Sequence, residues 1–476
     1  MPRGIFLKKM PPCTMLAMSA SELKAQWTLY NPSMSPARRR SKSSSPALPS
    51  YDEAAALVAA YAARLARLRP GSRSSGPDGP CTERVPLDQA LGRVFAEPLL
   101  ADADQPPFAR STRDGFACRA AEVSSHRHLA VAGSTRAGQT SSAPLPRGSA
   151  WEIMTGASVP AGADAVVMLE HVEETGAPSA RVIRLLPPRT IRKGENIVAR
   201  GAQARKGDNL LPAGSLIGAA QIALAGSCGC ATLNVFLKPR VAILSTGDEL
   251  VPIRSSPGPS QIRNSSSAML AALVSVAGGS PWVLPIARDT DKSLDAALAR
   301  AASADLLLIT GGVSAGKFDL VEPALARAGA RFHFTGVRIQ PGKPLVFGEM
   351  PRRSTNPVQN ENGTKCTIFG LPGNPVSSAV TFLLFAAPVV AALAGKRDRG
   401  PRFALARLTE DVKTKTGLTR FLPAACTFSG TVPEVALVTW QGSGDLAAMA
   451  RANCFLVVPE DSDRLRAGST VRILLP

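Results

Sequence analysis

Three glycine-rich segments carry the groups that could bind a charged ligand. Each follows a short apolar run, and these runs begin at Leu306, Ile339 and Ile368. A short apolar run that ends in glycine is typical of a buried parallel strand that delivers its loop to the carboxyl edge of a sheet. Ligands bind at that edge in open α/β sheets, and glycine lets backbone N–H groups approach an anion closely. The groups expected there belong to Gly311, Gly312, Ser314, Asp319, Lys343, Asn374 and Ser377.

These groups predict a pocket for a phosphate-like oxyanion, with the carboxylate of Asp319 at its rim. A single Gly-Gly turn is usually only a turn, and one Pro-Gly-Lys-Pro is most often a surface loop. Three such loops between Leu306 and Ser378 are better explained by a binding site. None of them matches the Gly-x-x-x-x-Gly-Lys-Ser/Thr pattern, so the pocket is not expected to be a P-loop.

Acidic residues beside glycine recur outside these loops. Asp114, Asp208 and Glu249 lie in such stretches, and Asp289 stands near the end of a predicted strand. Taken alone, each is best explained as an ordinary turn. Beside an oxyanion pocket they suggest Mg²⁺, which binds one or two carboxylates together with substrate phosphates.

Composition narrows the class of protein. The chain has 476 residues, of which 45% are hydrophobic, so two to four domains with a sizeable core are expected. The net charge of +19 suits an anionic ligand, and residues 1–50 contribute +7 of it. The remaining +12 is a mild excess and aromatic residues are only 5%, which disfavours a nucleic-acid partner.

The cysteines and the apolar runs indicate a reducing, cytosolic setting. The eight cysteines are scattered, with Cys228 and Cys230 the closest pair, and there are only four histidines, so a structural zinc site is not expected. The most membrane-like run, 376–393, contains a proline and is predicted to be a buried helix, so no membrane partner is expected. Residues 1–50 are rich in Ser, Pro and Arg and predict a disordered basic tail, with organelle targeting as the second interpretation.

Periodicity divides the rest of the chain. Tyr51–Leu68 has helical spacing, and residues 128–200 contain short strands separated by turns, which predict a small β domain. From Pro239 to about Lys396, strands alternate with helices and predict a parallel sheet with right-handed crossovers, interrupted by a polar surface insertion at 351–365. Short strands then continue to the end and predict a C-terminal β barrel or sandwich.

Taken in order, these motifs resemble those of the molybdopterin molybdenumtransferase family, which includes the E domain of gephyrin and its plant counterpart. The resemblance runs from about Tyr51 to the C-terminus. One motif would be weak evidence, but seven in the family's order are strong evidence. The motifs are Ser-Thr-Arg-Asp-Gly-Phe-Ala at 111–117, Thr-Gly-Ala at 155–157 with Pro-Ala-Gly-Ala-Asp-Ala-Val-Val at 160–167, Gly-Glu-Asn at 194–196, Ser-Thr-Gly-Asp-Glu-Leu at 245–250, Gly-Gly-Val-Ser-Ala-Gly at 311–316 with Asp319, Pro-Gly-Lys-Pro at 341–344 and Leu-Pro-Gly-Asn-Pro-Val-Ser at 371–377.

The resemblance implies a multidomain α/β plus β fold. An elongated linker domain is expected from residues 51–100 and 201–237, which flank an inserted β domain at 101–200. An α/β parallel-sheet domain of the molybdopterin-binding fold is expected at 238–397, and a C-terminal β-barrel domain at 398–476. The family forms dimers in which the α/β domain of one subunit meets the β domain of the other, so a homodimer is expected.

The family inserts molybdate into adenylylated molybdopterin and releases AMP, so a Mg²⁺-dependent transferase of molybdenum cofactor biosynthesis is expected. Its partners would be these two substrates, with the molybdopterin adenylyltransferase as a further candidate. By resemblance, Asp319 is tied to cleavage of the pyrophosphate link, and Asp319 and Glu249 are the expected Mg²⁺ ligands. Asp208 and Asp114 match other acidic catalytic positions, and the further substrate-binding positions are Thr155, Asp289, Lys343, Pro344, Ser377 and Ser443.

Four residues depart from the family's pattern. Gln340 stands where a lysine is usual, which removes a positive charge from the expected molybdate pocket, and Arg338 on the same strand face is expected to compensate. Ser266 replaces an asparagine, Lys317 occupies a position that is often acidic, and Pro423 replaces a common arginine. These departures bear on molybdate affinity more than on the fold.

Three other interpretations are compatible with parts of the sequence. Related adenylyltransferases share the α/β unit but carry Gly-Gly-Thr-Gly where this chain has Gly-Gly-Val-Ser, and they lack the three other domains. A gephyrin-like scaffold would need a second α/β unit, for which residues 1–50 are too few. A catalytically weakened paralogue stays open because of Gln340.

Overall fold

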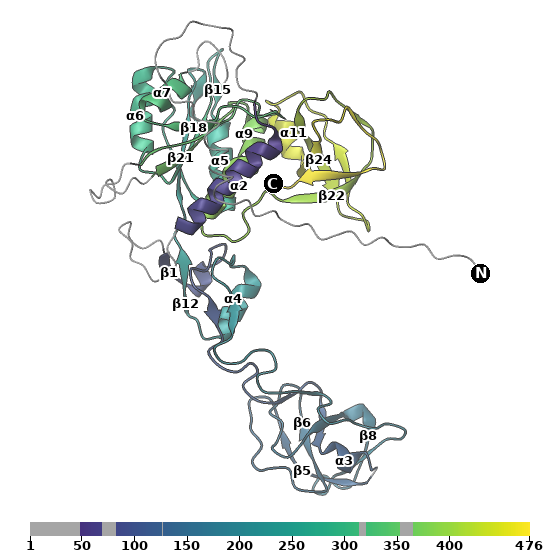
Figure 1. Cartoon of the computed structure of the whole chain (residues 1–476). Helices are drawn as coiled ribbons and strands as arrows, with labels where there is room; N and C mark the ends of the chain where they lie inside the picture. The colour runs from purple at the N-terminus through teal and green to yellow at the C-terminus, as the bar shows by residue number, and fades with distance from the viewer. Residues whose placement is uncertain (1–47, 69–81, 126, 314–319, 353–364) are drawn as a thin grey trace, which may run out of the picture. The chain divides into compact units, whose positions relative to one another are not determined.

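The computed structural model describes residues 48–68, 82–125, 127–313, 320–352 and 365–476 (Figure 1). The predicted basic tail lies outside the described residues except for 48–50, and so does most of the predicted insertion at 351–365. Ser314, Lys317 and Asp319 also lie outside them.

The first described helix, α2 (Tyr51–Leu68), has the bounds that its helical spacing predicts. A capping box starts it, because the Ser50 N–H donates to Glu53 Oε2 at 2.8 Å and the Glu53 N–H donates to Ser50 Oγ at 3.2 Å. Its apolar face packs against the helix α10 (Ala387–Leu393). The buried residues of that face are Tyr51, Ala54, Val58, Tyr61 and Ala62.

A six-stranded sheet in the order β16-β13-β17-β21-β20-β18 forms the α/β domain. Strands β16, β13, β17 and β21 are parallel, as predicted, but β20 and β18 run antiparallel to their neighbours. The prediction of a parallel sheet is therefore wrong at this edge. The segment that joins β18 to β20 contains no helix, and parallel neighbours need a long crossover connection. The strands are β13 (Arg240–Ser245), β16 (Ser280–Val283), β17 (Leu306–Thr310), β18 (Arg331–Phe334), β20 (Val346–Pro351) and β21 (Lys365–Leu371).

Helices cover both faces of this sheet (Figure 1). Val241 and Ile243 of β13 pack in one core with α2 and α10, whereas Ala242 and Leu244 face the other core. Successive residues of a strand point to opposite faces, so a strand covered on both sides is apolar throughout. The helices are α5 (Ser265–Ala277) on the α2 side, α6 (Asp291–Ala301) and α7 (Val321–Arg327) on the other, and α9 (Pro375–Thr381), which continues through η3 (Phe382–Ala386) into α10.

The stretch Pro375–Leu393, which contains α9, η3 and α10, confirms the buried helix predicted at 376–393. Among the described residues it alone is long and apolar enough to cross a membrane by length and composition. However, 83% of its most apolar window is buried inside the protein, as in the core helix of a globular domain.

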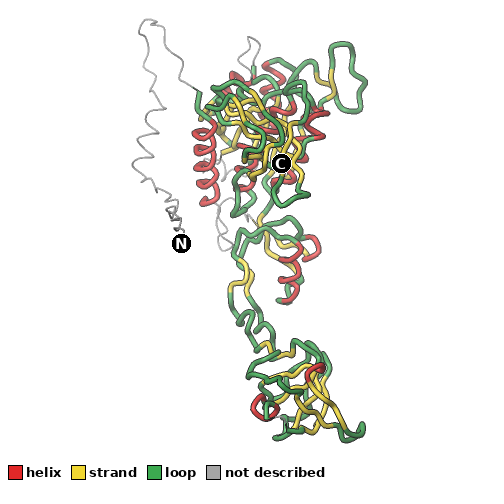
Figure 2. Tube along the Cα trace, turned by 90° about the vertical axis from the view of Figure 1, so that its right-hand side faces the viewer, coloured by secondary structure: helices red, strands yellow, loops and turns green. Residues whose placement is uncertain are grey.

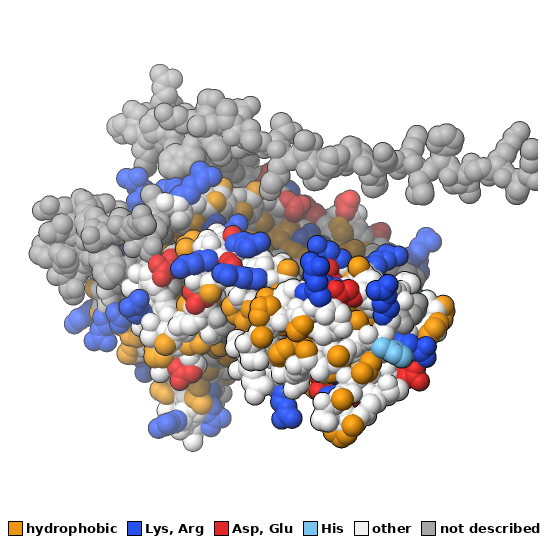
Figure 3. Space-filling model, turned by 90° about the horizontal axis from the view of Figure 1, so that it is seen from below, with side chains coloured by type: hydrophobic (Ala, Val, Ile, Leu, Met, Phe, Trp, Pro, Cys, Tyr) orange, Lys and Arg blue, Asp and Glu red, His pale blue; other side chains and the backbone are white. Residues whose placement is uncertain are grey.

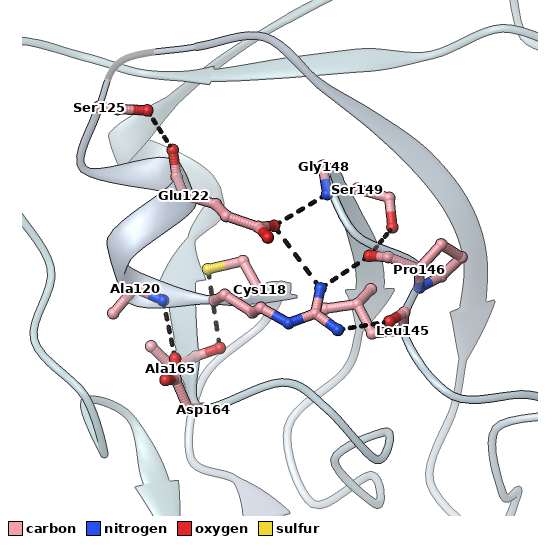
Figure 4. Close-up of polar contacts among 11 residues, drawn as sticks. Cys118, Ala120, Glu122, Ser125, Leu145, Pro146, Gly148, Ser149, Asp164 and Ala165 are labelled. Carbon is pink, nitrogen blue, oxygen red and sulfur yellow. Dashed lines mark hydrogen bonds and ion pairs between the residues drawn. The ribbon is translucent and has the colours of Figure 1, made fainter.

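The inserted β domain contains a second six-stranded sheet, in the order β7-β4-β6-β5-β9-β8. Arg119 ties one loop of this domain to the short helix α3 (Ala120–Val123), because its two Nη atoms donate to the carbonyls of Leu145 and Pro146. Glu122 accepts from the Gly148 N–H at 3.0 Å (Figure 4). Glu122 also pairs with Arg119. The strands are β4 (Gly115–Cys118), β5 (Leu129–Thr135), β6 (Ser149–Ile153), β7 (Ala165–Met168), β8 (Val172–Thr175) and β9 (Val182–Leu185), with η2 (Leu169–His171) between β7 and β8.

The chain segments before and after this insertion pair with each other. Antiparallel pairs form between β1 and β12, between β2 and β11, and between β3 and β10, and the helix α4 (Ala219–Ser227) adds to their small core. The elements are β1 (Thr82–Pro86), η1 (Leu87–Gln89), β2 (Leu99–Leu100), β3 (Arg110–Ser111), β10 (Ile197–Val198), β11 (Asn209–Leu211) and β12 (Thr232–Phe236).

The C-terminal strands close into a five-stranded barrel, because β24 pairs with both β25 and β26. A short strand from the α/β domain, β19 (Ile339–Gln340), pairs in parallel with the start of β24. The barrel strands are β22 (Phe403–Leu408), β24 (Thr419–Thr427), β25 (Glu434–Leu437), β26 (Cys454–Val458) and β28 (Thr470–Leu474). The smaller elements nearby are β23 (Val412–Lys413), α11 (Leu446–Arg451) and β27 (Arg464–Leu465), and β14 (Leu250–Val251) pairs with β15 (Ile262–Arg263) in the α/β domain.

The distribution of helices agrees with this division of the chain into domains. Figure 2 shows the helices gathered mainly around the α/β sheet, whereas the inserted domain is largely strand and loop.

Figure 3 shows Lys and Arg side chains dispersed among uncharged surface rather than gathered into one stripe on the visible face. Many surface cations also have a carboxylate partner, such as Arg184 with Glu173 and Arg327 with Asp291.

Neighbouring residues of α2 provide a test of this packing. Val58 is 1% exposed in the core beneath the helix, whereas Leu57 is 40% exposed. We expect Val58→Ala to lower the free energy of unfolding by about 2 kcal/mol through lost burial and a residual cavity. Leu57→Ala should change it by less than about 0.5 kcal/mol, as is usual at the surface. Urea unfolding curves of both variants would measure the difference, and equal effects would show that α2 does not pack as described.

Candidate functional site

The parallel strands β13, β17 and β21 end side by side, with Ser245 opposite Thr310 and Thr310 opposite Leu371. The loops that follow begin at the same edge, because the Thr246 N–H donates to the Thr310 carbonyl at 3.0 Å and the Gly311 N–H donates to the Leu371 carbonyl at 3.4 Å. The first and third glycine-rich loops therefore meet at the carboxyl edge of the sheet, as predicted.

Glycine is required where these loops meet. Gly311 has a φ of +93°, and a Cβ there would collide with the carbonyl oxygen of Thr246. A Cβ on Gly373 of the third loop would lie 3.5 Å from Gly311 Cα, which is ordinary van der Waals contact. The backbones after β13 and β17 can therefore approach one another only because residue 311 has no side chain.

The second loop reaches this edge by a route that the sequence analysis did not anticipate. Ile339 and Gln340 were predicted to belong to the same sheet, but they form β19 and pair with the barrel strand β24. The loop instead precedes β20, whose first residue pairs with Gly370 near the end of β21. Because β20 is antiparallel, its start lies where the parallel strands end, and this brings Lys343 and Pro344 to the edge. Lys343 is exposed there.

Two carboxylates stand at the end of β13. The Thr246 hydroxyl donates to Asp289 Oδ1 at 2.6 Å, which holds Asp289 beside the strand and leaves its second oxygen free of that bond. Glu249 is exposed, and its carboxylate folds back over Gly247. The sequence indicated both acids but not the positioning role of Thr246, although Thr246 lies within the motif at 245–250.

These oxygen donors can be compared with what Mg²⁺ requires. Among the described residues, no group of three or more His, Cys, Asp or Glu side chains is placed to hold a metal ion. A cage made only of protein ligands is therefore not formed by the described part of the chain. Mg²⁺ needs only one or two carboxylates when phosphates and waters supply the other oxygens. The exposed carboxylate of Glu249 fits that second arrangement, and Asp319 lies outside the described residues.

A buried polar network supports the same edge from below. Asn264 caps the N-terminus of α5 by accepting from the Ser267 N–H at 3.2 Å, and its Nδ2 donates to Ser267 Oγ at 2.8 Å. Ser245 at the end of β13 joins them, with its Oγ 2.8 Å from Ser267 Oγ. The sequence Asn-Ser-Ser-Ser is a typical helix start and could have predicted this cap. Ser266, the departure from the family's pattern, is half-buried beside the network.

The third loop also contacts the barrel. Asn374 Nδ2 donates to Ser443 Oγ at 2.9 Å, and the Val376 N–H donates to the Ser443 carbonyl at 3.1 Å. Two residues that were predicted separately therefore touch. Ser377 is only 4% exposed in the first turn of α9.

Asp114 and Thr155 form a second group within the inserted β domain. Asp114 Oδ1 accepts from the Thr155 N–H at 2.6 Å and from its hydroxyl at 2.9 Å. The backbone hydrogen bond from Thr155, followed by that from its hydroxyl, holds the pKa of Asp114 below its usual value. Asp114 is therefore a fixed, ionised acceptor at neutral pH.

Asp208 is placed as a turn residue. Its Oδ2 accepts from the Arg205 N–H at 2.8 Å, and the adjacent Gly207 N–H donates to the Ala101 carbonyl at 2.8 Å. Among the described residues, none of the other predicted site residues makes a hydrogen bond or ion pair with Asp208.

A cavity of about 720 Å³ is bordered at Glu460 by one predicted site residue, Arg338, which pairs with that glutamate. The start of α2 and one end of the barrel line it, through residues such as Tyr51, Thr419, Glu460 and Arg472. None of the residues predicted to bind substrate is among those that line it, so the sheet edge described above is the better candidate site.

Comparisons with known proteins agree with this architecture. Residues 49–229 match the MoeA N-terminal region (domains I and II), 242–392 match a probable molybdopterin binding domain, and 405–475 match the MoeA C-terminal region (domain IV). The chain is 34% identical to a molybdopterin molybdenumtransferase of Nostoc sp., over 83% of this chain and 88% of that protein. The corresponding values are 34%, 83% and 90% for the Bacillus subtilis enzyme and 32%, 82% and 93% for that of Haemophilus influenzae.

The chain belongs to the molybdopterin molybdenumtransferase family. It is accordingly a transferase with a role in molybdenum cofactor biosynthesis. Solved structures agree: two of the molybdopterin biosynthesis moeA protein from Pyrococcus horikoshii match it with TM-scores of 0.70 and 0.64. They are 28% and 30% identical, and the matches cover 90% and 88% of this chain and 100% and 98% of those chains. The matches to the MoeA N-terminal and C-terminal regions, on either side of the α/β domain, distinguish this family from proteins that share that domain alone.

Gln340 stands where the resemblance led us to expect a lysine, and the structure shows which residues surround it. Gln340 is exposed, and its Oε1 accepts from Arg420 Nε at 2.9 Å. Arg338, which was expected to compensate for the lost charge, is instead paired with Glu460 at 3.2 Å. The cation beside Gln340 is therefore Arg420, which sequence analysis missed because its strand is remote in sequence and meets β19 only in the folded chain.

Two glycines test the close packing of the sheet edge. Gly138 also has a positive φ, +84°, but a Cβ there would meet nothing within 4 Å. Gly138→Ala should therefore cost about 1 kcal/mol of stability from the backbone conformation alone. Gly311→Ala should cost about 3 kcal/mol or more, because the new Cβ displaces Thr246 as well. Chemical unfolding of the two variants measures the difference, and equal costs would refute the contact between Gly311 and Thr246.

The Asp114–Thr155 pair predicts a pH effect with a definite sign. Thr155→Val removes the hydroxyl donor but keeps the N–H, so the pKa of Asp114 should rise only part of the way to its usual value. Because the folded pKa is depressed, its stabilising effect is present above the unfolded pKa and is lost as the pH falls through the folded value. Titration of the Asp114 carboxyl carbon by NMR in both proteins would check this. An unchanged pKa would mean that the hydroxyl bond is absent in solution.

Proposed function

We propose that this protein inserts molybdate into adenylylated molybdopterin and releases AMP. The observation that carries the proposal is the glycine-containing sheet edge, where Asn374 of the third loop binds Ser443 and Thr246 holds the carboxylate of Asp289. The start of β20 lies at the same edge and follows the loop that carries Lys343. Membership of the family supports the same substrates. Molybdate and the pyrophosphate of the nucleotide are both oxyanions, so one edge built for oxyanions suits both.

The groups at this edge favour electrostatic rather than covalent catalysis. The backbone N–H of Gly312 and the ammonium of Lys343 would neutralise charge that develops on the phosphates. The dithiolene sulfurs that receive molybdenum belong to the substrate, so no protein thiolate is required. In agreement, burial raises the pKa of Cys366 and Cys454 to about 12, which keeps these thiols protonated at neutral pH.

The proposal includes Mg²⁺, which Glu249 and Asp319 would hold. When bound, it would neutralise the pyrophosphate oxygens and favour cleavage of the link that releases AMP. We expect EDTA to abolish AMP release and added Mg²⁺ to restore it. Full activity in excess EDTA would remove the ion from the proposal.

The decisive experiment incubates the purified protein with adenylylated molybdopterin and molybdate, and follows AMP release and formation of active cofactor. Asp319→Asn should abolish AMP release while substrate binding and thermal stability stay close to wild type. Asp88→Asn serves as a control, because Asp88 is an exposed acid in η1, remote from the sheet edge in sequence. Wild-type turnover by Asp319→Asn would remove this residue from the mechanism, and no AMP release by wild type would overturn the proposed reaction.

Because of the substitution at Gln340, a second candidate function is that of a catalytically weakened paralogue or a gephyrin-like scaffold. Such a protein would bind the molybdopterin substrate but release AMP slowly or not at all. The same assay, together with a binding measurement, separates the two.

Assembly and location complete the proposal. A homodimer, in which the inserted β domain of one subunit faces the α/β domain of the other, would place Asp114 and Thr155 near the oxyanion edge. Light scattering during gel filtration would test it, and a monomeric mass with full activity would contradict it. A cytosolic location and delivery of the substrate by the molybdopterin adenylyltransferase remain predictions of the same proposal.

A further inference from the structure

Arg420 is a nearly buried cation at the junction of two domains. It lies on the barrel strand β24, opposite Gln340 of β19 on one side and Val458 of β26 on the other. Only 8% of the residue is exposed. Two of its five N–H groups are used, since Nε donates to Gln340 Oε1 at 2.9 Å and Nη1 donates to the Leu418 carbonyl at 3.0 Å.

The charge of Arg420 has no counter-ion among the described residues. No Asp or Glu in the described part of the chain forms an ion pair with it, whereas Arg338 on the neighbouring strand is paired with Glu460. Burying an unpaired charge is costly, so buried guanidinium groups nearly always have an anionic partner. Its Nη2 makes no hydrogen bond with a described residue and is not fully buried, so a ligand from solution could reach it.

The position of Arg420 suggests what that partner is. Gln340 immediately precedes the loop 341–344, which carries Lys343 to the sheet edge. The partners that Arg420 already has are neutral carbonyl oxygens, which orient a guanidinium without cancelling its charge. A guanidinium with free N–H groups recognises tetrahedral oxyanions by a forked pair of hydrogen bonds.

We propose that Arg420, oriented by Gln340, binds a tetrahedral oxyanion at this junction, either molybdate or a phosphate of the nucleotide. The inference rests on the function proposed above and adds a specificity-determining residue to it. In this chain Arg420 of the barrel strand β24 supplies the positive charge. The side-chain oxygen of Gln340 accepts the hydrogen bond that orients the guanidinium.

A single isosteric change tests this without removing the buried group. Gln340→Glu should convert the hydrogen bond into an ion pair and give Arg420 an internal counter-ion. The thermal midpoint should therefore stay the same or rise, while the affinity for molybdate falls about tenfold or more. Gln89→Glu adds the same charge at an exposed position in η1 and should leave both quantities unchanged. Isothermal titration with sodium molybdate measures the affinity, and a parallel titration with AMP shows which oxyanion the site prefers.

Exchanging the two groups makes a second test. Gln340→Lys alone places a like charge against Arg420 and should lower the thermal midpoint. The double variant Gln340→Lys/Arg420→Gln returns the pair to one cation and one amide, and should keep the affinity for the preferred oxyanion within about threefold of wild type. Arg420→Gln alone should lose about tenfold or more. Arg407→Gln is the control arginine, since Arg407 is exposed on β22 and already paired with Glu434.

The outcomes separate this inference from the proposed reaction. If wild type binds molybdate or AMP and both Gln340→Glu and Arg420→Gln bind it equally well, Arg420 only joins the two strands and the inference fails. If wild type binds neither anion, the inference also fails. If binding is lost in both variants but wild type releases no AMP from adenylylated molybdopterin, the oxyanion site stands and the proposed reaction is wrong.

Discussion

The candidate site depends on one steric constraint: the carbonyl oxygen of Thr246 occupies the space where any residue other than glycine at 311 would place its Cβ. This contact lets the loops after β13 and β17 touch, and Gly373 of the third loop packs against the same point. A wider spacing would separate the backbone N–H groups that could surround an anion. The glycines therefore matter less for flexibility than for the distance between strands at one edge of the sheet.

The second requirement is that the barrel docks on the α/β domain. The strand β19 leaves the α/β domain to pair with β24, and Asn374 reaches Ser443 at 2.9 Å. Apolar packing secures the same junction, since the ring of Tyr51 in α2 lies 5.4 Å from that of Phe421 in β24, edge to face. The proposed oxyanion site would thus be built from two domains, which is why Arg420 of the barrel can stand beside Gln340 of β19.

The antiparallel edge of the sheet explains why the second loop could be recognised but not placed. The pattern Pro-Gly-Lys-Pro after an apolar run indicated a loop near an anion, and Lys343 does lie at the sheet edge. The run before it, however, belongs to the barrel, and the edge is reached because β20 reverses direction. The direction of a strand is set by the neighbouring strands with which it pairs. A run of a few apolar residues does not determine that pairing.

Local patterns in the sequence determined the elements and the residue types of the site. Helical spacing located α2, apolar runs located the strands that end at the sheet edge, and the glycine-rich loops after them suggested oxyanion chemistry, because each pattern depends on residues close together in the chain. Tertiary structure alone decided which groups meet. Thr246 holds Asp289, Asn374 holds Ser443, and Arg420 rather than Arg338 stands beside Gln340. The physical reason is that hydrogen bonds and ion pairs act over a few ångströms in space, and the partners here are joined by strand pairings between segments tens of residues apart.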